Sequence, residues 1–402
     1  MAFRRRVNEV CVTSERAVPK FRRMALTSKL TFQPASAFQP ELKKRVDAYF
    51  EEKGISKYAN NLMVAKTIFW LAFTWGTWAV ILFVPTSFPV MLALFAVQGF
   101  GFACIGFNIG HDAIHGGYSA KPWVNKALSW CFDVMGASSA TWAISHNVVH
   151  HTYTNIQKVD DDLEPGPWMV FYPQPTKPWH KFQHLYAWFL YCFVGVIWMY
   201  VKDFAQLGNK DPLTGKAIPK SAWVQLFTGK ALHIALLLVA PLVVIQAPLW
   251  QILIGYVVFL AAAGFTLAIV FQLAHCIEGV VFPRLPAEAS RGAAKMPDAW
   301  AEHQLRTTAN FGKTWLATWI CGGLDHQIEH HLMPRICHIH YPALAPIVKK
   351  CAEDHGLPYL HSGSFFEAVA SHTRTLKQLG NGVDVEAYEA DRSPNGTVLP
   401  AE

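Results

Sequence analysis

Histidine is the residue type whose spacing points most clearly to chemistry in this chain. The sequence has 18 histidines, and eight of them stand in three tight groups at 111–115, 146–151 and 326–331. The first group reads His-Asp-Ala-Ile-His, and each of the other two ends in two adjacent histidines. Because imidazole nitrogens bind zinc, copper, iron and nickel, the three groups together predict a metal site.

The first two groups have the spacing of one helical face. Residues i and i+4 lie above one another on an α-helix, so His111 with His115, and His146 with His150, can each hold one metal. The adjacent His151 then points about 100° away and can reach a second metal.

The third group repeats this form, with Gln327 followed by His330 and His331. His326 precedes the glutamine and is one position out of phase, so we expect it not to bind. His275 ends an apolar segment just as His111 does, which makes it a further candidate ligand. Two histidine doublets favour two metal ions over one.

The number and type of candidate ligands favour iron. Structural zinc sites take four ligands and usually include cysteine. The eight cysteines form no C-x-x-C pair, and we expect reduced, mostly buried thiols. Eight histidine nitrogens suit two irons with positions left open for oxygen. Neighbouring carboxylates are expected to accept hydrogen bonds from the other ring N–H of each ligand: Asp112, Asp160, Asp161, Asp162, Asp325 and Glu329. Residues 160–162 could equally form a solvated turn.

Two uncharged blocks must position these groups. Residues 67–110 and 231–274 are each 44 residues long and contain no Asp, Glu, Lys or Arg. A membrane-spanning helix needs roughly 20 apolar residues, so each block predicts two spans joined by a turn, at 85–89 and at 246–248. The positive-inside bias predicts that both hairpins start and finish in the cytoplasm.

Two shorter apolar stretches, 127–142 and 185–201, lie between the hairpins. If residues 127–142 crossed the membrane alone, the second histidine group would lie on the opposite side from the first. If residues 185–201 crossed alone, the second hairpin would start on the opposite side from the first. We therefore expect both to be helices that lie in the interface or dip into it. The predicted fold is all-α and integral to the membrane: four spans in two hairpins, interfacial helices and a cytosolic, histidine-rich helical cap.

The chain is expected to divide into three parts. Residues 1–60 form a cytosolic segment, which is loose over 1–38 and contains a surface helix over 39–60. Residues 61–375 form the membrane domain. Residues 376–402 form a flexible tail. Both termini are expected to be cytoplasmic. The net charge of +7 comes from basic residues that suit anionic head groups at a membrane, and we expect no nucleic-acid partner.

The motifs HDAIHGGYS, HNVVHHTYTN and DHQIEHHLMP, in this order around two hairpins, resemble those of membrane fatty-acid desaturases over roughly residues 60–360. The third motif has Gln327 where many desaturases have histidine, and in this it resembles the motif of front-end desaturases of the acyl-lipid or linoleoyl-CoA type. The resemblance implies that iron is bound by His111, His115, His146, His150, His151, His275, His330 and His331. It further implies that Gln327 is a weak or indirect ligand and that Asn310 holds a metal-bound water.

The same resemblance implies an O2-dependent enzyme that introduces a cis double bond into an acyl chain. The chain would be carried on coenzyme A, a lipid or a carrier protein, and would lie in an apolar tunnel near such residues as Phe102, Phe107, Trp142, Phe265 and Phe271. The sequence contains no His-Pro-Gly-Gly haem motif, so we expect an external electron donor, a ferredoxin or a cytochrome b5. A related lipid hydroxylase or monooxygenase is the nearest alternative, and a membrane metal-binding or transport protein is a distant one.

Overall fold

The computed structural model describes residues 30–208, 217–286, 293–312 and 314–383. The predicted loose segment and tail lie partly outside this range, as do both termini. In this described part of the chain, four helices are long and apolar enough to cross a membrane, as predicted. They are α2 (Asn61–Phe83), α3 (Phe88–Ile105) with its continuation to His115, α11 (Lys220–Ile234) with its continuation to Val244, and α13 (Leu249–His275).

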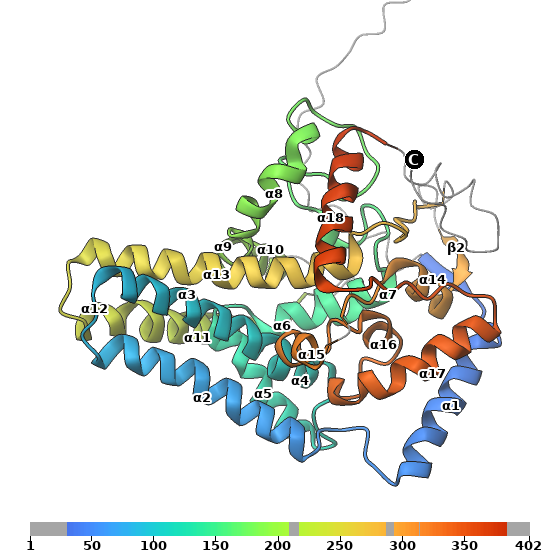
Figure 1. Cartoon of the computed structure of the whole chain (residues 1–402), viewed down its shortest axis with the longest axis horizontal. Helices are drawn as coiled ribbons and strands as arrows, with labels where there is room; N and C mark the ends of the chain where they lie inside the picture. Colours follow the sequence, from blue (N-terminus) through green and yellow to red (C-terminus); the bar gives the residue numbers. More distant parts are fainter. Residues whose placement is uncertain (1–29, 209–216, 287–292, 313, 384–402) are drawn as a thin grey trace, which may run out of the picture.

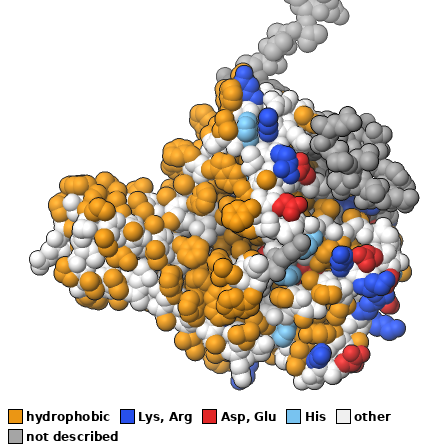
Figure 2. Space-filling model, viewed as in Figure 1, with side chains coloured by type: hydrophobic (Ala, Val, Ile, Leu, Met, Phe, Trp, Pro, Cys, Tyr) orange, Lys and Arg blue, Asp and Glu red, His pale blue; other side chains and the backbone are white. Residues whose placement is uncertain are grey.

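The four spans form an arm whose two hairpin tips lie at the same end of the molecule (Figure 1). The predicted turns are confirmed, since α2 ends at Phe83 and α12 (Ala240–Val244) ends just before residues 245–248. At the tips, the rings of Phe88 and Trp250 are 5.1 Å apart. The surface of the arm is almost entirely apolar, whereas charged side chains gather on the rest of the visible face (Figure 2). Both hairpins therefore start and finish on the side that carries the histidine groups.

Glycines bring the two central spans together. A Cβ atom on Gly99 of α3 would lie 2.3 Å from the carbonyl oxygen of Phe259 on α13, and one on Gly255 would meet the ring of Phe95 at 2.4 Å. Membrane helices associate through such close backbone contacts because lipid gives no hydrophobic driving force between them. This pair holds the ends of α3 and α13, and so His111 and His275, at a fixed separation.

The two stretches between the hairpins are bent rather than straight. The first forms α5 (Pro122–Met135) and α6 (Ser139–Trp142), which are separated at Gly136, where φ is 95°. The second begins with η6 (His180–Phe182) and α8 (Gln183–Tyr191), turns by 70°, and goes on through α9 (Val194–Ile197), η7 (Trp198–Lys202) and α10 (Asp203–Leu207). A fifth span would require this bent pair to cross as one unit.

The remaining elements form a body at the end of the arm. Helix α1 (Phe38–Lys53) packs against α17 (Tyr341–Asp354), and together with α14 (Trp300–Thr307) and α16 (Gln327–Leu332) they bury one apolar cluster. Four short elements, η5 (Asp161–Leu163), β2 (Ala294–Ala299), α15 (Trp315–Cys321) and η10 (His338–His340), and the longer helix α18 (Phe365–Gly380) also belong to this body.

Two boundaries differ from the prediction. Residues 30–38 are not loose, because β1 (Leu30–Gln33) pairs in parallel with β2 and Phe38 is fully buried. This small sheet also adds strands to a fold predicted to be all-α. The expected tail from residue 376 begins inside α18, where Leu376 and Leu379 are buried against the helices around residues 170–191.

Candidate metal centre

Two π-helical turns place the first two histidine groups. Helix α3 runs through η3 (Gly106–Gly110) into α4 (His111–His115), and α6 runs through η4 (Ala143–His150) into α7 (His151–Tyr153). A π-turn bonds residue i to i+5 and often marks a functional site. This departure from α-helical spacing was not predicted from the sequence.

The π-helical segment gives His146 two histidine neighbours. His146 and His150 remain close enough to share an ion, as predicted, since one nitrogen of each ring and a carboxylate oxygen of Asp162 lie within 4.8 Å of one another. The Nε2 atom of His146 also lies 3.2 Å from Nε2 of His151, its i+5 neighbour. His150 further contributes to a group with residues of α13 and α16.

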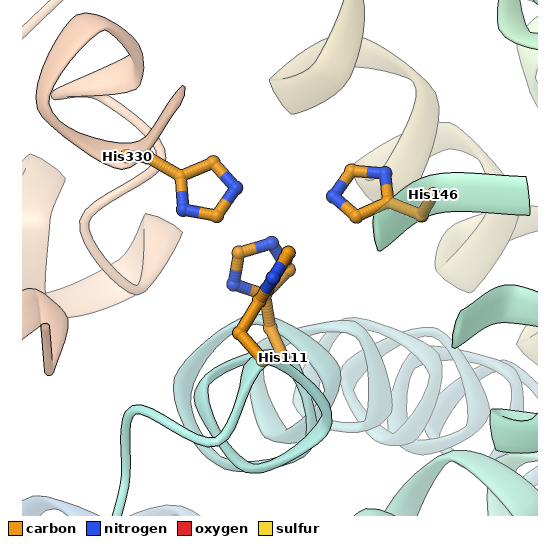
Figure 3. A group of neighbouring side chains, drawn as sticks. His111, His146 and His330 are labelled. Atoms are coloured by element: carbon orange, nitrogen blue, oxygen red, sulfur yellow. The ribbon is translucent and has the colours of Figure 1, made fainter. Parts of the chain in front are cut away.

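Four histidines form the first group: His111 and His115 from α4, His146 from η4 and His330 from α16 (Figure 3). One nitrogen from each ring lies within 4.8 Å of the others. All four side chains are buried. The rings of His111 and His330 are 4.4 Å apart, although 219 positions separate them in the chain.

His150, His275 and His331 form a second group by the same distance criterion. His151 lies between the two groups, since its nearest ligand nitrogens belong to His330 and His331 as well as to His146. The structure thus gathers all eight predicted histidines, from three groups and the end of α13, into one buried cluster. His326 is in none of the metal-capable groups and lies beside Asp325 instead, at 3.2 Å.

The unpaired nitrogens of this cluster fit metal ions. Seven of the eight rings have a buried nitrogen with no hydrogen-bond partner: His111 Nε2, His115 Nε2, His146 Nδ1, His150 Nε2, His151 Nδ1, His330 Nε2 and His331 Nε2. Buried polar atoms without a partner are rare in native proteins, and a cluster of them needs an explanation such as an ion. These buried histidine clusters can bind metal.

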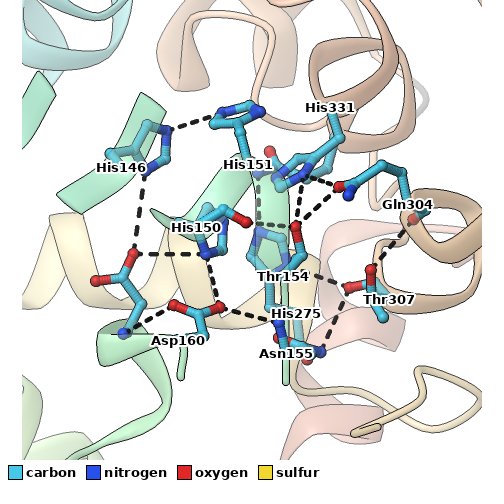
Figure 4. Close-up of polar contacts among 12 residues, drawn as sticks. His146, His150, His151, Thr154, Asn155, Asp160, His275, Gln304, Thr307 and His331 are labelled. Carbon is cyan, nitrogen blue, oxygen red and sulfur yellow. Dashed lines mark hydrogen bonds and ion pairs between the residues drawn. The ribbon is translucent and has the colours of Figure 1, made fainter. Parts of the chain in front are cut away.

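The opposite nitrogens of three rings are held by hydrogen bonds (Figure 4). His150 donates from Nδ1 to Asp160 at 2.8 Å, and His331 donates from Nδ1 to Gln304 at 2.8 Å. His275 donates from Nδ1 to the Thr307 carbonyl at 3.2 Å. Such bonds fix the tautomer and the ring orientation of metal-binding histidines, and in His150 and His331 the other nitrogen has no partner.

Burial keeps most of these rings neutral. Burial, reinforced by the charge that neighbouring histidines would carry, holds the pKa of His151, His330 and His331 well below its usual value. Neutral imidazole is the form that binds metal. For His150, burial acts in the same direction, but the carboxylates of Asp160 and Asp162 together outweigh it and raise the pKa. The Asp160 carboxylate therefore serves as a buried partner rather than as part of a solvated turn.

The other predicted supporting residues are placed unevenly. Gln327 lies beside the second group, with its Nε2 atom 2.9 Å from His275 Nε2 and its Oε1 buried without a partner. Asn310 and Glu329 bond to each other at 2.8 Å, and Asn310 also accepts from the backbone N–H of Ile328, so both brace the third histidine group from behind. Asp112 accepts from His338 at 2.8 Å rather than from one of the eight histidines.

Three residues of this network were not predicted. Gln304 accepts from His331 and from Thr154, and Asn155 donates to the His275 carbonyl at 2.9 Å. Asn155 has φ of 57°, a conformation that asparagine tolerates better than most residues. Thr154 and Asn155 are the last two residues of the HNVVHHTYTN motif, so their place in the sequence was a signal. No such signal marked Gln304.

Comparison with known proteins places this geometry in a family. Residues 85–363 match the fatty acid desaturase family. The chain belongs to the fatty acid desaturase family. The resemblance drawn from the three histidine motifs is therefore confirmed, and the chain is an oxidoreductase that desaturates fatty acyl chains.

Several relatives align along most of the chain. It is 36% identical to an sn-1 linoleoyl-lipid 6-desaturase of Arthrospira platensis, over 90% of this chain and 98% of that one. It is 35% identical to the protein of the same name in Synechocystis sp., over 89% and 99%. An acyl-lipid (8-3)-desaturase of Physcomitrium patens is 31% identical over 88% of this chain and 74% of its own length.

Proposed function

We propose that this desaturase holds two iron ions in the histidine cluster and inserts a cis double bond at the front end of a lipid-bound acyl chain. The observation that carries the proposal is the set of buried histidine groups, in each of which one ring nitrogen per residue lies within 4.8 Å of the others. When bound, iron would supply the O2 chemistry that takes one hydrogen from each of two adjacent methylenes, while two electrons from an external donor and two protons complete the reduction of O2 to two waters.

The ligands divide between the ions as the two groups do. His111, His115, His146 and His330 would hold one ion, and His150, His275 and His331 would hold the other, with His151 shared or assigned to either. Gln327 would support the second group through its unpaired Oε1 atom. Asn310 and Glu329 would act by fixing the helix of the third motif.

The residues around the first group supply an apolar, water-excluding wall. Trp142 stacks on His146 with ring centroids 3.9 Å apart, and Phe132 packs against Trp142 at 5.0 Å. A small apolar cavity of about 30 Å³ lies near them, lined by Phe102, Phe132, Met135, Trp198, Met199 and Phe259. Of the tunnel residues named from the sequence, Phe102 lines this cavity. An acyl chain would need the cavity to widen, and once inside it would be kept from bulk water during hydrogen removal.

The histidine side of the molecule is proposed to face the cytoplasm. The hairpin tips carry no charge, while basic side chains lie at the other end of the spans, as the positive-inside bias requires. A soluble ferredoxin or cytochrome b5 would deliver electrons there. The names of the relatives and the presence of Gln327 support front-end regioselectivity. The word "lipid" in those names supports a lipid as the acyl carrier.

Expression of the chain in a host with simple lipids, followed by fatty-acid profiling, tests the function. We expect a new product two hydrogens lighter than its precursor, with the double bond between an existing one and the carboxyl end. His150→Ala and His331→Ala should abolish it, whereas His184→Ala, which removes a histidine outside the cluster, should not. A product that gains oxygen instead would identify a hydroxylase, and activity surviving in both cluster variants would refute the ligand assignment.

A further inference from the structure

A cleft of about 530 Å³ opens beside His115, at the edge of the metal centre. Its volume falls in the range of small-molecule sites, about 300–1,000 Å³. The inner wall consists of small side chains (Ala113, Gly116, Ala140 and Ala143) together with His115 itself. The cleft is therefore a route from the surface to the first histidine group.

The charge of this cleft is entirely positive. Lys57, Lys126 and Arg335 line it, all three exposed, and no aspartate or glutamate is among the lining residues. Within the described residues, none of the three forms an ion pair with a carboxylate. Lys126 donates to the neutral Gln225 side chain at 2.8 Å, which leaves its charge in place.

Backbone hydrogen bonds hold the cationic walls in position. The Cys337 N–H donates to the Lys57 carbonyl at 2.9 Å, and the Ala59 N–H donates to the Tyr118 carbonyl at 3.0 Å. At Gly117 a Cβ atom would lie 3.2 Å from the Pro334 carbonyl oxygen, so the segment that carries Arg335 packs directly on the loop after α4. These contacts preorganise the site, since Lys57 and Arg335 project from segments that are tied together.

The cleft lies where the chain enters the membrane arm. Asn60 caps the first span, three residues after Lys57, by accepting from the Met63 N–H at 3.0 Å. Trp123, which follows the lining residue Pro122 in the first turn of α5, is 69% exposed. Exposed tryptophan and lysine side chains at the ends of spans are typical of the head-group level of a bilayer.

We propose that this cleft binds a phosphate group of the acyl substrate, held by Lys57, Lys126 and Arg335 while the acyl chain passes His115. The inference rests on the proposed function and adds the chemistry of the carrier to it. The phosphate can belong to a phospholipid head group or to coenzyme A. A neutral glycolipid lacks the charge that three unpaired cations would recognise.

The test measures binding without turnover, so it is independent of whether the protein desaturates the ligand. Iron-loaded full-length protein in detergent is titrated with dioleoyl phosphatidylglycerol, with a dioleoyl galactolipid and with oleoyl coenzyme A, and the bound fraction is read by native mass spectrometry. We expect the two phosphate-bearing ligands to bind more tightly than the galactolipid. Lys57→Gln and Arg335→Gln should each weaken that binding about five-fold, the usual effect of one basic residue on an anionic lipid.

Lys53→Gln is the matched control, because it removes the same charge four residues from Lys57 and outside the cleft. Preference for phosphatidylglycerol or for coenzyme A would both support the phosphate site and would tell the carriers apart. Equal binding of the galactolipid, or equal losses in Lys53→Gln and Lys57→Gln, would overturn it. So would cleft variants that bind all three ligands normally but are reduced more slowly by an acidic electron donor, since the cleft would then be the donor's docking surface.

Discussion

In the arm, α3 and α13 meet through glycines with almost no room for a methyl group, whereas the histidine cluster is held by hydrogen bonds to side chains of several elements. Close packing of backbone and apolar side chains determines how the helices of the arm associate. In the histidine cluster, hydrogen bonds to the ring nitrogens determine how the rings are oriented. The two regions should therefore fail in different ways when one group is changed.

The largest expected effect follows from removing a ligand of the first group. His330→Ala should abolish desaturation and lower the bound iron, since one nitrogen of a buried group of four is lost. Product analysis by gas chromatography and the iron content per chain would measure this. His326→Ala is the matched control, because His326 lies in the same motif but in none of the metal-capable groups. Equal iron loss in both variants would contradict the assignment.

Metal removal should separate the two regions directly. When the free metal concentration is a thousand times the dissociation constant, binding adds about 4 kcal/mol to the free energy of unfolding. The apo-protein lacks this contribution. Chelation should therefore speed amide exchange in η4, α7 and α16, while α3 and α13 keep their protection. Hydrogen-exchange mass spectrometry can follow all these helices. Uniform loss of protection along α13 would show that the arm depends on the metal as well.

The next effect tests a hydrogen bond to a ring. Gln304→Leu removes the acceptor for His331 Nδ1, and such supporting contacts usually change metal affinity or activity by about 10–100-fold. Competitive chelation would measure the iron affinity. Gln304→Glu keeps an acceptor oxygen and should restore much of the affinity. An iron affinity unchanged in Gln304→Leu would mean that the ring is oriented by packing alone.

A smaller effect is expected in the arm. Gly99→Ala places a Cβ atom 2.3 Å from the Phe259 carbonyl oxygen, and overpacking of this kind costs about 1–3 kcal/mol. Thermal unfolding in detergent should show a lower Tm. Gly76→Ala on α2 is the matched control, since nothing lies within 4 Å of its Cβ position and alanine favours a helix by about 1 kcal/mol. If both variants lower the Tm alike, close packing is not what holds the arm.

The same contrast explains what the sequence could predict. The four spans and their turns follow from uninterrupted apolar composition, which needs no knowledge of tertiary contacts. The eight histidines could be chosen because their type and spacing are local signals. Their division between two groups could not, because a π-turn at residues 143–150 shifts His151 against His146. Gln304 was missed because its role depends on a tertiary contact: it reaches His331 only when α14 packs beside α16.

The smallest effect concerns a polar contact inside the arm. His233 lies within 2.8 Å of the Tyr256 hydroxyl, which also contacts the Tyr200 hydroxyl at 3.0 Å. His233→Leu leaves Tyr256 with its second partner, and hydrogen bonds between membrane helices average about 0.6 kcal/mol. We expect a barely lower Tm and unchanged iron content. A loss as large as that of Gly99→Ala would mean that polar contacts, and not shape alone, specify the arm, which would remove the contrast with the histidine cluster.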